Sequence, residues 1–78
     1  MGSSEHREFR WDIYFRKLGV LARVIAELWE SDNVELQARA RRAKQHYDFC
    51  HRLHAVRAEP ETALKALKDL AAVLRGDR

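Results

Sequence analysis

Residues 11–33 have the sequence WDIYFRKLGVLARVIAELWESDN, and this stretch decides the fold class. Its apolar residues recur at alternating spacings of three and four, which places them on one face of an α-helix. They are Trp11, Tyr14, Leu18, Leu21, Ile25 and Leu28. The stretch ends in Ser-Asp-Asn, whose side chains compete for backbone hydrogen bonds and favour turns. We therefore predict a helix from about residue 5 to residue 30, followed by a tight turn.

A second helix should follow this turn at once. Asp32 and Glu35 are spaced as a capping box, in which each side chain bonds a free backbone N–H of the other residue. The same seven-residue pattern then continues to about Val56 through six positions. They are Leu36, Ala40, Ala43, Tyr47, Cys50 and His54. A turn this short makes the first two helices antiparallel neighbours.

A third helix should begin at Pro60, after a second turn at residues 57–59. Proline suits the first helical position because its missing N–H costs nothing there, and Gly76 suits the end of the helix. The expected core stripe of this helix is Leu64, Leu67, Leu70, Ala71 and Leu74. Three helices joined by turns this short predict an all-α, up-down-up three-helix bundle.

Composition limits the remaining possibilities. The chain has 78 residues, of which 46% are hydrophobic and 35% charged, a mixture typical of a globular helical domain. Its single cysteine excludes an internal disulfide and favours a reducing compartment such as the cytoplasm, or an engineered protein. No apolar run approaches the length of a membrane span, so we expect a soluble protein without membrane insertion. Residues 5–78 should form one domain, preceded by a disordered Met-Gly-Ser-Ser leader at residues 1–4 that matches the start of common expression tags.

The first two helices carry more apolar residues than a core needs. On the first helix a second stripe lies almost opposite the core face, and on the second helix another stripe flanks the core positions. Because both stripes are displaced in the same rotational sense on antiparallel helices, we expect them to form one continuous surface. Its predicted members are Phe9, Ile13, Lys17, Val20, Val24, Arg42, His46, Phe49 and Val56.

Exposed apolar patches of this size usually mark interaction sites, which predicts a non-catalytic protein-binding module with a partner of unknown identity. Two alternatives remain open. The same stripes can pair two copies of the chain as a homodimer, or a different rotation of the helices can bury them in the core. Tyr14 and Trp29, at the edges of the core face, are further interface candidates.

A cluster of polar residues in the second helix has metal-like spacings, since ligands at i and i+4 share a helix face. It consists of His46, Cys50, His51 and His54. However, His46 and His54 are two helical turns apart, about 12 Å, which is too far for one ion. Cys50 and His51 are adjacent and point away from each other, so they do not form a nucleophile and its base. We therefore predict no metal, no cofactor and no enzymatic activity.

Residues 39–44, RARRAK, give the strongest nucleic-acid signal in the chain. Their four positive charges scatter around the helix instead of aligning along one face. Binding of nucleic acid is therefore a weaker interpretation than a solvated, salt-bridged surface.

The chain resembles computationally designed three-helix mini-protein binders. The resemblance rests on the two minimal turns, the Glu-Pro-Glu-Thr-Ala-Leu start of the third helix at residues 59–64, its alanine- and leucine-rich stripe and the tag-like leader. Such proteins present the outer face of two helices to a target protein and use the third helix as support. The resemblance therefore implies a protein-binding surface on the first two helices.

Overall fold

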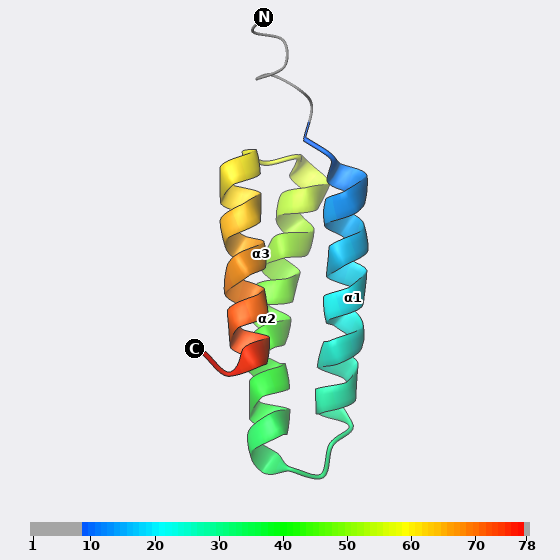
Figure 1. Cartoon of the computed structure of the whole chain (residues 1–78), viewed down its shortest axis with the longest axis vertical. Helices are drawn as coiled ribbons and strands as arrows, with labels where there is room; N and C mark the ends of the chain where they lie inside the picture. The colour runs from blue at the N-terminus through cyan, green and yellow to red at the C-terminus, as the bar shows by residue number, and fades with distance from the viewer. Residues whose placement is uncertain (1–8, 78) are drawn as a thin grey trace, which may run out of the picture.

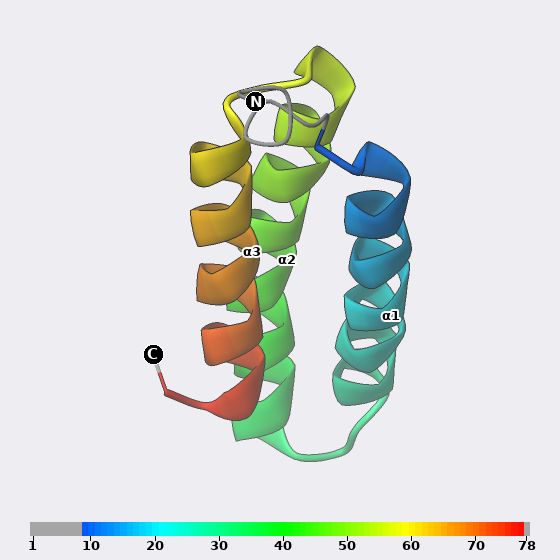
Figure 2. The ribbon, with the colours of Figure 1, turned by 45° about the horizontal axis from the view of Figure 1, so that its top comes forward.

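The computed structural model describes residues 9–77, which form three helices and no strand. Helix α1 spans Trp11–Trp29, α2 spans Val34–Val56 and α3 spans Pro60–Arg75. Each helix runs antiparallel to the one before it, which confirms the predicted all-α three-helix bundle (Figure 1). Helix α2 packs against both of the others, whereas α1 and α3 lie on different sides of α2 and touch each other much less (Figures 1 and 2).

Helix α1 begins later than predicted, at Trp11 instead of residue 5. Phe9 and Arg10 are not helical, and Arg10 has φ −84° and ψ 84°. The Arg10 guanidinium bonds the Asp12 carboxylate at 3.0 Å, and the Phe9 ring turns back onto Trp11 with ring centroids 4.7 Å apart. These two contacts favour a bent entry over another helical turn. The rest of the predicted extension, and the predicted leader at residues 1–4, lie outside the described residues.

The cap of α2 is Asn33, not Asp32 as predicted. The Asn33 side-chain oxygen accepts hydrogen bonds from the backbone N–H of Glu35 at 2.8 Å and of Leu36 at 3.2 Å. Asn33 has the extended backbone of an N-cap, and the Ser31 hydroxyl accepts its N–H at 3.0 Å. Because the helix starts one residue later, Glu35 occupies the second helical position and the capping box does not form.

The ends of α3 agree with the prediction. Pro60 is the first residue of the helix, and Gly76 caps its end with a positive φ of 87°. The positive φ favours glycine there, whereas a Cβ atom would only displace the flexible end of the Arg39 side chain, whose guanidinium would lie 2.9 Å away. Before α3, Arg57 ends α2 in the left-handed conformation, with φ 52°.

The core lies where α2 meets its two neighbours. It comprises Tyr14, Leu18 and Ile25 of α1, Ala40, Ala43, Cys50 and Leu53 of α2, and Ala63, Ala66, Leu70 and Val73 of α3. The other predicted core positions of α1 and α2 are partly buried against it. Many of the fully buried residues on α2 and α3 are alanines, which let these two helices approach closely.

Helix α3 differs from its prediction in which face it buries. It carries two parallel apolar stripes with identical spacing, offset by one residue. The buried stripe is Ala63, Ala66, Leu70 and Val73, and the second stripe is Leu64, Leu67, Ala71 and Leu74. Only Leu70 of the predicted core stripe is fully buried, and Leu64 keeps 45% of its surface exposed. The second stripe of α3 therefore faces outward from the α2–α3 contact.

Candidate protein-binding site

The outer apolar stripe of α1 borders a groove between α1 and α3. The groove has a volume of about 350 Å³, and apolar side chains from both helices form its walls. They are Val20 and Leu21 of α1 with Leu67 and Ala71 of α3. Val20 keeps 61% of its surface exposed. Ile13, which is exposed, and Val24, which is partly buried, share the side of α1 that carries Val20.

Two lysines complete this groove, one on each wall. Lys17 comes from α1 and Lys68 from α3, and both are exposed. Neither takes part in the ion pairs found within residues 9–77. No acidic side chain of the described chain lines the groove. The groove therefore combines apolar walls with positive charge on both sides.

The outer stripe of α2 lies on a different face of the bundle. Phe49 and Val56 are 45% and 66% exposed, and Arg42 is exposed as well. His54 marks the side of α2 that faces α1, because it stacks on Phe15 with ring centroids 4.7 Å apart. Val56 follows two residues later and lies about 200° around the helix from His54. The outer stripes of α1 and α2 consequently do not form the continuous surface that we predicted.

Two further predicted residues are not part of an outer stripe. Phe9 packs at the end of the core, with its ring centroid 5.9 Å from that of Tyr14. It precedes the first residue of α1, so helical periodicity does not place its side chain. His46 is partly buried on α2.

The α3 wall of the groove was missed because its apolar residues, Leu67 and Ala71, were assigned to the core. The sequence did contain a signal for this wall, because α3 carries two complete apolar stripes at the same spacing. A helix that packs mainly on one neighbour buries only one apolar stripe, so the other stripe was available to form a surface. The missed residues are Leu67, Lys68 and Ala71.

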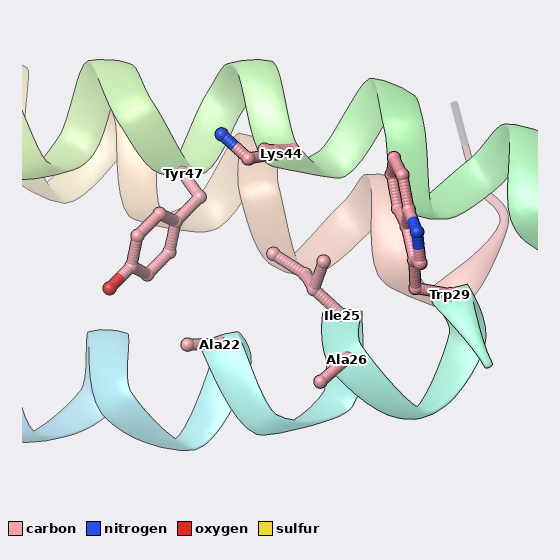
Figure 3. Close-up of a pocket in the computed structure, with 6 residues that line it drawn as sticks. All are labelled: Ala22, Ile25, Ala26, Trp29, Lys44 and Tyr47. Carbon is pink, nitrogen blue, oxygen red and sulfur yellow. The ribbon is translucent and has the colours of Figure 1, made fainter.

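A second hollow, of about 270 Å³, lies between α1 and α2 (Figure 3). Tyr47 and Trp29 stand at its two ends, and aliphatic side chains of α1 form its floor (Figure 3). The floor consists of Ala22, Ile25 and Ala26. The cations beside it already have partners, because Lys44 pairs with Asp48 at 3.2 Å and the Arg41 guanidinium lies 5.9 Å from the Trp29 ring centre. This hollow is therefore lined mainly by apolar side chains, and the two cations beside it already contact other residues of the chain.

The histidine and cysteine side chains of α2 are separated by the fold. Cys50 is fully buried, and burial raises the pKa of its thiol. His51 and His54 lie beside α1, with ring centroids 6.5 Å apart. Burial, followed by the charges of Arg57 and His51, lowers the pKa of His54. Within residues 9–77 no three His, Cys, Asp or Glu side chains gather closely enough to hold a metal ion.

The basic run of α2 is also dispersed, as its periodicity predicts. Arg39 folds toward Gly76 at the end of α3, and its buried Nε has no hydrogen-bond partner among residues 9–77. Arg41 lies over Trp29, Lys44 pairs with Asp48, and Arg42 is exposed. The four cations therefore do not form one face that could follow a phosphate backbone.

No protein-family model, no curated protein and no solved structure matches this chain. None of the helices within residues 9–77 combines the length and the apolar character needed to cross a membrane. The assignment of function therefore rests on the geometry of the groove.

Proposed function

We propose that this chain is a non-catalytic protein-binding module whose partner docks as an α-helix in the groove between α1 and α3. The observation that carries the proposal is the pair of apolar walls left partly uncovered on α1 and α3, the two helices that pack on α2. Those walls consist of Val20, Leu21, Leu67 and Ala71.

A helix suits this groove better than an extended peptide. Helices α1 and α3 run in the same direction on either side of α2, so the groove between them follows the helix axes (Figure 1). In four-helix bundles each helix packs against two neighbours at axial distances of about 8–10 Å. A fourth helix here has α1 and α3 as these neighbours. Apolar partner residues spaced three and four apart then cover Val20 and Leu67, and each well-buried side chain contributes about 1.5–3 kcal/mol.

The groove is a better candidate than the outer patch of α2. Phe49 and Val56 belong to a single helix face, which offers a partner one convex wall. The groove has two walls, so an inserted side chain loses water on both sides and gains more contacts. Phe49 and Val56 remain exposed apolar residues for which this proposal assigns no role.

The chemistry of Cys50 supports binding over catalysis. A reactive cysteine needs an accessible thiolate, whereas burial favours the protonated thiol of Cys50. The adjacent His51 is exposed and lies against the aromatic rings of α1 and α2, with its centroid 6.0 Å from Phe15 and 6.1 Å from Tyr47. Neither residue is placed as a nucleophile and its base.

The proposal is tested with a model peptide of three heptads that has leucine at positions a and d and glutamine at e and g. Titrated into isotope-labelled protein, it should shift the NMR signals of Val20, Leu21, Leu67 and Ala71 first. The Val20→Asp variant should lose this binding by at least about tenfold, because a charge then enters an apolar interface. Val34→Asp is the matched control, since Val34 is 76% exposed and lies outside the groove.

Two results would contradict the proposal. One is a set of shifts centred on Phe49 and Val56 that Val20→Asp leaves unchanged, which would move the binding surface to α2. The other is a stable dimer in sedimentation that Val20→Asp dissociates, which would make a second copy of the chain the occupant of the groove.

A further inference from the structure

We infer that the helix accepted by the α1–α3 groove carries acidic residues along both flanks of its apolar stripe. This inference rests on the binding function proposed above and adds the chemical character of the partner. It follows from the positions of Lys17 and Lys68, one on each wall of the same apolar groove.

The two lysines are arranged as flanking charges of a helical interface. Each has a four-carbon stem that can lie along the apolar wall while the ammonium group stays at the rim. In coiled coils the residues beside the apolar seam, at positions e and g, carry the charges that select the partner. In the groove, Lys17 lies one helical turn before Val20 and Leu21 on α1, and Lys68 lies next to Leu67 on α3, so each wall contributes one charge beside its apolar residues. A helix seated between them therefore meets a positive charge on each of its flanks.

Both ammonium groups are available to a partner. Neither lysine belongs to an ion pair within residues 9–77, although other cations of the described chain do, including Lys44 and Lys65. Lys68 also lines two neighbouring hollows of α3, which contain Glu61 and Asp69, whereas no acidic residue of the described chain lines the groove itself. An apolar helix without acids would leave both ammonium groups hydrated at the rim, whereas acidic flanks would add one ion pair on each side.

A second copy of the chain fits the groove less well than an acidic helix. In a twofold dimer the same surface meets itself, so the groove of one copy would face the groove of the other. Lys17 and Lys68 of both copies would then converge on an interface to which the groove itself contributes no acid. Like charges brought together in this way repel one another.

The test compares three peptides that share leucine at positions a and d and differ only at e and g. One carries glutamate there, one glutamine and one lysine. We expect the glutamate peptide to bind about three- to tenfold more tightly than the glutamine peptide at low salt, and the lysine peptide to bind most weakly. The preference should shrink as salt rises, because screening weakens exposed ion pairs.

Charge reversal of the protein provides the decisive comparison. The double variant Lys17→Glu with Lys68→Glu should invert the order, so that the lysine peptide binds most tightly. The double variant Arg23→Glu with Arg52→Glu is the matched control, because it changes net charge equally at exposed positions outside the groove. It should retain the order seen with the unmodified chain.

The possible failures are distinguishable. If all three peptides shift the groove signals with equal affinity, the inference about acidic flanks is overturned and the proposed binding function stands. If none of them binds, the proposed function itself fails. If both charge-reversed variants weaken the preference equally, the preference reflects net charge, and Lys17 and Lys68 have no special role.

Discussion

Tyr14 and Cys50 combine polar groups with complete burial. The Tyr14 hydroxyl donates a hydrogen bond to the backbone oxygen of Ala63 at 3.1 Å and thereby links α1 to α3. Burial, together with the neighbouring Cys50, raises the pKa of Tyr14 well above its usual range. Burial is also the main cause of the raised pKa of Cys50, to which the charge of Asp69 adds, whereas the hydrogen bond with Tyr14 lowers it. Both groups are therefore held in their protonated form by the fold.

This arrangement predicts a loss of stability in alkaline solution. The unfolded chain releases the thiol proton near about pH 8.5 and the phenol proton near about pH 10, whereas the folded chain retains both. The folded state then binds more protons than the unfolded state, so the free energy of unfolding falls as pH rises above about 8.5. Urea denaturation at several pH values between neutral and alkaline measures this slope.

A double variant provides the control for the alkaline slope. Tyr14→Phe with Cys50→Ala removes both titrating groups, and the loss of the Tyr14 hydrogen bond alone should cost about 1 kcal/mol at neutral pH. Its stability should nevertheless depend less on alkaline pH than that of the unmodified chain. Equal slopes in the two proteins would show that other groups cause the alkaline loss.

At the scale of single helices, the caps determine where α2 starts. Asn33 accepts two backbone N–H groups of the first turn, whereas no hydrogen bond of this kind involves Asp32 within the described residues. Asn33→Ala should therefore lower the free energy of unfolding by about 1 kcal/mol. Asp32→Ala, at an exposed position one residue earlier, should change it by no more than about 0.5 kcal/mol.

Chemical denaturation of the two alanine variants decides between the caps. A larger loss in Asp32→Ala than in Asn33→Ala would mean that the capping box predicted from the sequence forms in solution. Helix content measured by circular dichroism should stay close to that of the unmodified chain in both variants, because packing of the buried faces stabilises most of each helix.

At the scale of the whole molecule, α2 is the central element. It supplies the contact surface for both neighbours, while α1 and α3 share little beyond the Tyr14 hydrogen bond and the groove. Amide hydrogen exchange should therefore be slowest in α2, between Ala40 and Leu53, where four buried residues anchor the helix. The exposed walls of the groove lie on the outer helices, which should exchange faster. Slower exchange in α1 than in α2 would contradict this arrangement.

The sequence by itself determined the number of helices, their relative direction and four of their six ends. These features depend on local interactions: the spacing of apolar residues, the preference of Pro60 for a helix start and the positive φ that Gly76 accepts. The core positions of α1 and α2 were also predictable, because a seven-residue pattern defines one face of each helix. The starts of α1 and α2 were not predicted correctly. Side-chain contacts near Trp11 and at Asn33 compete with the local helix signals and moved both starts.

Only the tertiary structure decided which outer stripes meet. Spacing along a chain gives the angle between two side chains on one helix, but not the rotation of that helix against its neighbours. The rotation of each helix about its own axis depends on which arrangement buries the most apolar surface of the three helices together. Here the small side chains Ala63 and Ala66 turn inward on α3, which leaves Leu64 exposed and Leu67 only partly buried. As a result, the outer stripe of α1 shares a groove with α3, and the outer stripe of α2 lies apart from it.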